Sequence, residues 1–155
     1  MNSTRTLPQL ANQKFLTDGG LETWLIFDEG IDIPNFASFT LMEDANAVST
    51  MKRYFNNHLD IARRHGAGFI LESPTWRASK DWADLMGIDQ QRLKAMTTKA
   101  VEMMLELHDE APVDQPTIIV SGNVGPRGDG YNPAFQMTAD EAEAGTELGF
   151  MTRSS

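Results

Sequence analysis

Two long stretches of the chain carry apolar side chains at the spacing of an amphipathic helix. The first places them three or four positions apart, at Val48, Met51, Phe55, Leu59 and Ala62. The second repeats this spacing at Leu93, Met96, Ala100, Met103 and Leu107. Because such a period puts the side chains on one helix face, we expect helices over about 45–65 and 90–108. Asp44 and Asp89 precede the two helices as N-caps, and Gly66 closes the first.

Three short apolar runs, each followed by polar or glycine residues, are typical of buried β-strands. They cover 15–17, 68–72 and 117–121. A continuous apolar run fits a strand that is covered on both faces, as in a parallel sheet. Shorter helices are expected over 21–27 and 79–86, with a loop over 30–35, and Thr138 opens a capping box for a final helix. This alternation of strands and helices favours an α/β fold with a parallel sheet.

Composition and charge exclude several classes of function. The 155 residues include 13 basic and 22 acidic side chains, and a formal charge of -9 repels nucleic acids. The sequence has no cysteine, so this chain alone makes no disulfide, thiolate zinc site, iron–sulfur cluster or cysteine nucleophile. Its three histidines lack the spacing of metal ligands.

The chain shows no sign of membrane insertion or export. Its apolar runs are only a few residues long, and residues 1–13 lack the apolar stretch of a signal peptide. We therefore expect a soluble cytoplasmic protein with no membrane partner, made of one domain or part of a larger one.

Every expected strand ends in polar groups. The three ends are Asp18-Gly19-Gly20, Glu72-Ser73 and Ser121-Gly122-Asn123. The carboxyl ends of parallel strands meet at one edge of a sheet, where α/β folds hold their sites. We therefore predict that Asp18, Glu72 and Asn123 share one concave region.

Each of the two carboxylates allows two interpretations. Asp18 either caps the helix that begins near residue 21 or holds a substrate amine beside the bare backbone of the two glycines. Glu72 either forms an ion pair, with Arg77 as the candidate, or is a partly buried carboxylate available for chemistry. Trp76, four residues after Glu72, is more often a packing residue than a ligand contact.

The segment from Ser121 to Tyr131 is unusually rich in glycine, with four glycines in nine residues. It lacks the Gly-Lys-Ser/Thr of a phosphate-binding loop, and its glycine spacing differs from that of the dinucleotide fingerprint. Its free backbone N–H groups would suit a carboxylate or another anionic group.

Three segments carry a family resemblance when taken together. They are Phe15-Leu16-Thr17-Asp18-Gly19-Gly20-Leu21-Glu22-Thr23, Ala67-Gly68-Phe69-Ile70-Leu71-Glu72-Ser73-Pro74-Thr75-Trp76-Arg77-Ala78-Ser79, and the glycine-rich segment 121–131. In order and spacing they resemble the N-terminal half of the homocysteine S-methyltransferase family, over roughly residues 14–144. The resemblance implies the first three strand–helix units of a (β/α)8 TIM-type barrel. It also implies methyl transfer to the thiol of homocysteine, giving methionine.

The resemblance further implies a set of substrate-binding residues and a cofactor. The residues are Asp18, Gly19, Gly20, Glu72, Ser73, Thr75, Trp76 and Asn123, of which the first three would lie against the amino-acid part of homocysteine. In the family, a zinc ion held by three cysteines binds the substrate thiol as a thiolate, which is a nucleophile at neutral pH. The family's methyl donors include S-methylmethionine, S-adenosylmethionine, betaine and methylfolate.

The chain departs from the family in its metal ligands and its length. The family's cysteines lie in the C-terminal half, and a complete barrel of this kind needs about 250 residues. We expect residues 1–13 to be a polar tail, 14–144 the N-terminal part of a homocysteine-binding barrel, and 145–155 an atypical tail left by truncation or a frameshift. Neither zinc binding nor methyl transfer is expected from this chain alone.

Two other hypotheses stay open. In one, the chain is a non-enzymatic binding or assembly module that associates with a partner or with itself through open sheet edges. In the other, it is a metal-independent enzyme that uses Asp18 and Glu72 as acid and base.

Overall fold

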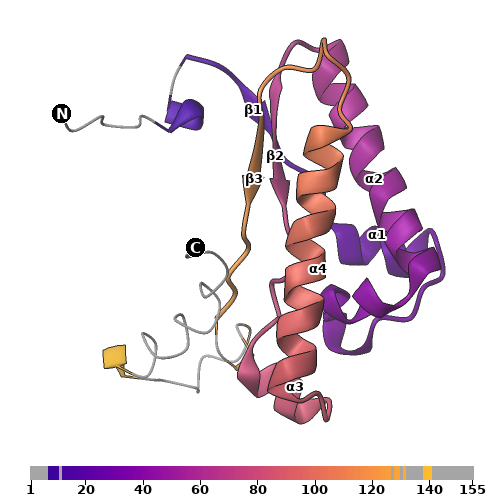
Figure 1. Cartoon of the computed structure of the whole chain (residues 1–155), viewed down its shortest axis with the longest axis vertical. Helices are drawn as coiled ribbons and strands as arrows, with labels where there is room; N and C mark the ends of the chain where they lie inside the picture. The colour runs from indigo at the N-terminus through magenta and orange to yellow at the C-terminus, as the bar shows by residue number, and fades with distance from the viewer. Residues whose placement is uncertain (1–6, 11, 127, 130, 132–137, 141–155) are drawn as a thin grey trace.

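The computed structural model of the chain describes residues 7–10, 12–126, 128–129, 131 and 138–140 (Figure 1). The described residues form one parallel sheet in the order β1-β2-β3. Its strands are β1 (Phe15–Leu16), β2 (Gly68–Glu72) and β3 (Ile118–Ser121). The predicted parallel sheet is therefore confirmed, with β1 and β3 each one residue shorter than expected.

The helices also follow the predicted pattern closely. They are α1 (Leu21–Phe27), α2 (Ala45–Arg64), α3 (Lys80–Leu85) and α4 (Gln90–Asp109). Two 3-10 helices, Pro34–Phe36 and Ser38–Glu43, join α1 to α2 and were not predicted, so the expected loop over 30–35 is in part wrong. Residues 139–140 are helical, while the rest of the expected final helix and the predicted tail at 145–155 lie outside the described residues.

Both predicted aspartate caps are confirmed. The Asp44 carboxylate accepts hydrogen bonds from the backbone N–H groups of Asn46 and Ala47, at 2.8 and 3.2 Å. The Asp89 carboxylate accepts one from Arg92 N at 2.8 Å. These bonds satisfy N–H groups that a helix start leaves without an internal partner.

The hydrophobic core lies between the sheet and the two long helices, which Figure 1 shows on the same side of the strands. Phe69 and Leu71 of β2 point into this core and are fully buried. Side chains alternate along a strand, so Ile70 lies on the opposite face, as does its neighbour Ile119. Both are only half-buried. The expectation that the strands are covered on both faces is thus wrong for the described residues, because both long helices pack on one face.

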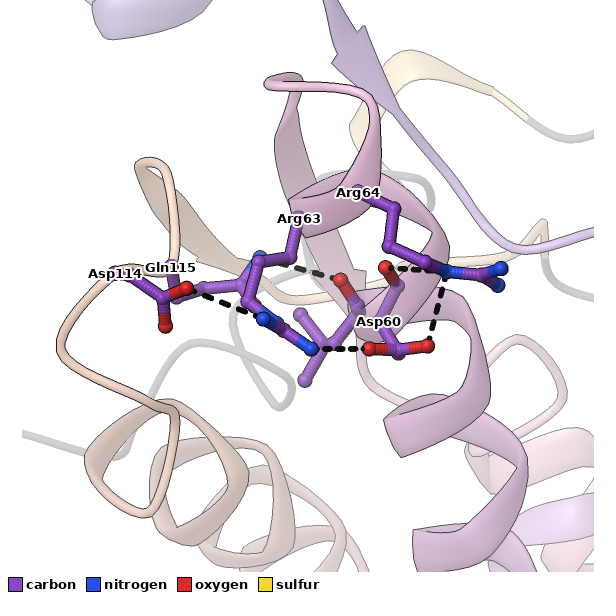
Figure 2. A network of polar contacts seen from close by, with 6 residues as sticks. Asp60, Arg63, Arg64, Asp114 and Gln115 are labelled. Carbon is purple, nitrogen blue, oxygen red and sulfur yellow. Dashed lines mark hydrogen bonds and ion pairs between the residues drawn. The ribbon is translucent and has the colours of Figure 1, made fainter.

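A polar network joins the end of α2 to the segment before β3, at the amino ends of the strands (Figure 2). Arg63 contacts the carboxylates of Asp60 and Asp114, at 2.6 and 3.1 Å. Arg64 contacts Asp60 at 3.1 Å, and Gln115 donates to the Leu59 carbonyl at 3.3 Å. Its ion pairs are largely exposed and contribute little stability. The network therefore lies at the amino ends of the strands, opposite the carboxyl ends, where the loops carry the candidate residues.

None of the described helices combines the length and apolarity that crossing a membrane requires.

Candidate functional site

A cavity of about 310 Å³ lies at the carboxyl ends of the strands. Its lining residues come from all three strand ends, from α1 and from α2: Asp18, Gly20, Leu21, Glu22, Phe55, Glu72, Ser73, Pro74, Trp76, Asn123 and Tyr131. The predicted grouping of Asp18, Glu72 and Asn123 in one concave region is confirmed. Of the eight residues proposed from the sequence, Gly19 and Thr75 do not line this cavity.

Thr75 connects the loop after β2 to the loop after β3. Its buried hydroxyl donates a hydrogen bond to the Asn123 carbonyl at 2.7 Å and lies 2.8 Å from the Ser73 hydroxyl. Ser73 Oγ in turn accepts from the Asn123 N–H at 3.2 Å. These bonds hold Asn123 at the cavity wall, so Thr75 supports the site from behind.

Asp18 lies half-buried in the cavity wall, in the turn between β1 and α1. The interpretation of Asp18 as a helix cap is wrong: the residue before α1 is Gly20, and no side chain caps this helix. Gly20 has φ +122°, a backbone conformation that residues other than glycine rarely adopt. The turn therefore releases Asp18 from the helix start and leaves its carboxylate at the cavity.

Tyr54 of α2, which the sequence analysis did not select, contacts this carboxylate. Its hydroxyl donates to Asp18 Oδ2 at 3.1 Å and accepts from the Gly19 N–H at 3.2 Å. Burial, and then the nearby Asp18 charge, raise the pKa of Tyr54 to about 12. Its O–H therefore stays protonated, and able to donate, at neutral pH.

Glu22 is a second cavity residue that sequence reasoning missed, although it lies within the first family-like segment. Its carboxylate accepts a hydrogen bond of 2.6 Å from the hydroxyl of Ser38, which is 2% exposed. Ser38 comes from a 3-10 helix that the hydrophobic pattern did not reveal. No pattern of neighbouring residues indicates that Ser38 contacts Glu22. The two side chains meet only because the 3-10 helix that carries Ser38 lies beside α1.

The structure does not support the suggested ion pair between Glu72 and Arg77. Among the described residues, Arg77 instead contacts the Asp129 carboxylate at 3.6 Å and stacks on Trp76 and Trp82, with 4.7 and 4.0 Å from its guanidinium carbon to the ring centroids. Within the same residues, the Glu72 carboxylate has no hydrogen-bond or ion-pair partner. It is half-buried at the cavity and available to a ligand.

Trp76 has both a packing and a lining role. It lines the cavity, and its ring lies edge-on to that of Tyr131 with 5.9 Å between centroids. The glycine-rich segment passes directly behind it: a Cβ built on Gly125 would lie 1.9 Å from the Trp76 carbonyl oxygen. Only a glycine allows this approach of two backbones.

The electrostatic character of the cavity follows from its lining. Three carboxylates, those of Asp18, Glu22 and Glu72, line it together with three aromatic rings, and the lining includes no lysine, arginine or histidine. A negative site of this kind attracts a positively charged group such as an ammonium. The Asn123 amide is a neutral group that can donate a hydrogen bond to a ligand carboxylate.

The residues present do not fit a zinc ion held by thiolates. The sequence has no cysteine. In the part of the chain that the structure describes, no three histidine, aspartate or glutamate side chains are grouped so that they could hold a metal ion. Tetrahedral zinc sites need three or four such ligands, so no metal-dependent step can be assigned to these residues.

Comparisons with known proteins agree with this architecture. The family model for homocysteine S-methyltransferase matches residues 15–146. Solved structures of the homocysteine methyltransferase MmuM from Escherichia coli, in metallated and oxidized forms, are 21% and 22% identical to the chain, with TM-scores of 0.66 and 0.65. Each match covers 94% of this chain and 51% of the solved chain. No curated protein sequence matches the chain.

The structural likeness concerns the fold. The chain spans about half the length of the solved structures, and its open parallel sheet with helices on one face corresponds to part of a TIM-type barrel. The predicted fold class, the first part of a (β/α)8 barrel, is thereby confirmed.

Proposed function

The chain belongs to the homocysteine S-methyltransferase family, and on that basis we propose that the cavity at the strand ends binds the amino-acid part of homocysteine. The observation that carries the proposal is the meeting of the Asp18 and Glu72 carboxylates with Asn123 in one cavity. The ammonium group of the substrate pairs with the two carboxylates. The carboxylate of the substrate accepts a hydrogen bond from the Asn123 amide. In this orientation the thiol of the substrate points away from the sheet.

The proposed role of this chain is binding and orientation of the substrate. In the family, zinc-bound thiolate formation makes homocysteine a nucleophile, but this chain has no cysteine with which to hold that zinc. The residues of the cavity therefore hold the amino acid and restrict its motion. Transfer of a methyl group from a donor, giving methionine, requires protein groups that the sequence does not contain.

The proposed binding domain covers residues 14–144, and its proposed compartment is the cytoplasm. The half-buried apolar side chains on the sheet face opposite the two long helices favour one further candidate, in which this domain is also an assembly module. Such a module would bury Ile70 and Ile119 against a partner or a second copy.

Calorimetric titration of L-homocysteine into the full chain, under reducing conditions, tests the binding proposal. We expect Glu72→Gln to weaken binding about tenfold, which corresponds to about 1.4 kcal/mol, because the variant removes one of the two charges that face the ammonium. Glu102→Gln is the matched control. Glu102 is exposed on α4, so this substitution removes the same charge at a position away from the cavity. Equal weakening in both variants, or no binding to the unmodified chain, would contradict the proposal.

A ligand without the amine sharpens this experiment. 4-Sulfanylbutanoate keeps the thiol and carboxylate of homocysteine but has no ammonium group. It should bind much more weakly than homocysteine to the unmodified chain and be insensitive to Glu72→Gln. Similar affinities for the two ligands would show that the carboxylates do not recognise the amine.

A further inference from the structure

Tyr54 occupies a position between the core and the cavity. The residue is 5% exposed, and its ring lies close to those of Trp24 and His58, with centroid distances of 5.0 and 4.3 Å. The ring is thus held by α1 and by its own helix, α2. A phenol buried in this way needs a hydrogen-bond partner.

The partners of the Tyr54 hydroxyl both belong to the turn after β1. The hydroxyl accepts from the N–H of Gly19 and donates to Oδ2 of Asp18. One oxygen of the carboxylate is therefore occupied, while Oδ1 has no partner among the described residues. A single side chain from α2 thus holds both the backbone and the carboxylate of this turn.

We propose that Tyr54 is a positioning residue that aims the Asp18 carboxylate into the cavity, so that its free oxygen meets the positively charged group of the ligand. The inference rests on the proposed function, because it assigns Tyr54 a role in binding the substrate amine. Tyr54 does not line the cavity and acts only through Asp18.

The physical reason is preorganisation. Asp18 precedes two glycines, which restrain the backbone of the turn less than any other residue would. A carboxylate that must be ordered when a ligand arrives costs affinity, whereas one already held in place does not. The hydrogen bond to a charged acceptor is of the stronger kind, and the rigid ring behind it fixes the direction of the donor.

One variant separates a packing role of the Tyr54 ring from a positioning role of its hydroxyl. Tyr54→Phe keeps the ring and its contacts with Trp24 and His58 and removes only the hydroxyl. Gly19 is an exposed residue, so its N–H can then bond to water. The variant is therefore expected to fold, and its effect should be concentrated on Asp18.

The first measurement needs no ligand. Three-bond couplings between the Asp18 carboxyl carbon and its backbone N and C′ atoms, measured by NMR on the full chain, report the populations of its χ1 rotamers. We expect one dominant rotamer in the unmodified protein and averaging over two or more in Tyr54→Phe. Thr97→Val, which removes a hydroxyl bonded to the Leu93 carbonyl in α4, should leave the Asp18 couplings unchanged. An unchanged Asp18 rotamer in Tyr54→Phe would overturn the proposal.

The second measurement is a double-mutant cycle on homocysteine affinity. Tyr54→Phe should weaken binding about tenfold in the unmodified background and have almost no effect in Asp18→Asn, because the residue acts through the carboxylate. The same loss in both backgrounds would show a structural role and refute the inference. If the unmodified chain does not bind homocysteine, the proposed function fails, and the rotamer measurement alone then decides the role of Tyr54.

Discussion

An alanine at Gly125 should displace the glycine-rich segment from the wall of the cavity. The new Cβ would lie 1.9 Å from the Trp76 carbonyl oxygen and 2.8 Å from its Cδ1 atom, both closer than the 3.0 Å limit that real Cβ contacts respect. Because the nearest atom belongs to the backbone, rotation of a side chain cannot relieve the contact. The segment itself must move, and the Thr75–Asn123 bond of 2.7 Å moves with it.

The expected cost is about 2 kcal/mol, the middle of the range for inserting a methyl group into a packed position. For a chain of this size, that corresponds to a fall of about 4–8 °C in melting temperature. Gly122→Ala is the matched control on the same segment, since a Cβ at Gly122 meets no atom within 4 Å. We expect it to change stability by less than about 0.5 kcal/mol.

Thermal unfolding followed by circular dichroism compares the two variants with the unmodified chain. Homocysteine affinity should fall in Gly125→Ala and stay unchanged in Gly122→Ala, because only the former displaces Asn123. If the two variants melt at the same temperature, Gly125 does not pack against the Trp76 backbone in solution, which contradicts this prediction.

Three further predictions address the helix cap, the buried tyrosine and the sheet face opposite the two long helices. Asp44→Ala should cost about 1 kcal/mol in urea titrations, because the carboxylate accepts two backbone N–H bonds; an unchanged midpoint would contradict the cap. Burial and Asp18 raise the pKa of Tyr54 from its ordinary value of 10.0 to about 12, so its stabilisation is complete below pH 10 and is lost as pH rises toward 12. Between pH 9 and 12, the free energy of unfolding measured with urea should fall less steeply with pH in Tyr54→Phe than in the unmodified chain. An identical slope in the two proteins would disprove the pKa shift. We expect the chain to self-associate in sedimentation velocity and Ile119→Lys to reduce this association, whereas Val113→Lys, on a fully exposed loop, should not; equal behaviour of the two variants would exclude the sheet face that carries Ile119 as the contact.

The sequence by itself determined the three strands and the four α-helices of the described residues, but not the 3-10 helices between α1 and α2. The stripes that include Met51 and Phe55 in α2, and Met96 and Met103 in α4, became buried helix faces as expected. These features follow from local rules, because helix and strand periods depend on residues only a few positions apart. The strand-end rule also located Asp18, Glu72 and Asn123 in one cavity, since a parallel sheet brings equivalent ends to one edge.

The sequence could not determine which faces of the elements meet. The apolar runs of β2 and β3 indicated strands covered on both sides, yet Ile70 and Ile119 remain half-buried. An apolar run shows that a segment favours the β conformation, but it does not show whether one or both faces of the strand will be covered. In the described residues, both long helices lie on a single face.

Only the tertiary structure decided the partners of the charged groups. Tyr54 lies 36 positions from Asp18, and Arg77 contacts Asp129 in place of the nearby Glu72. Such pairs depend on how α2 packs against the turn after β1, and on where the glycine-rich segment crosses behind Trp76. Periodicity is a property of neighbouring residues, whereas a hydrogen bond between distant segments depends on the position and orientation of whole elements. The strand-end residues Asp18, Glu72 and Asn123 were therefore readable from the sequence, whereas Glu22 with its partner Ser38, and Tyr54 with its partner Asp18, could be identified only from the packing of distant elements.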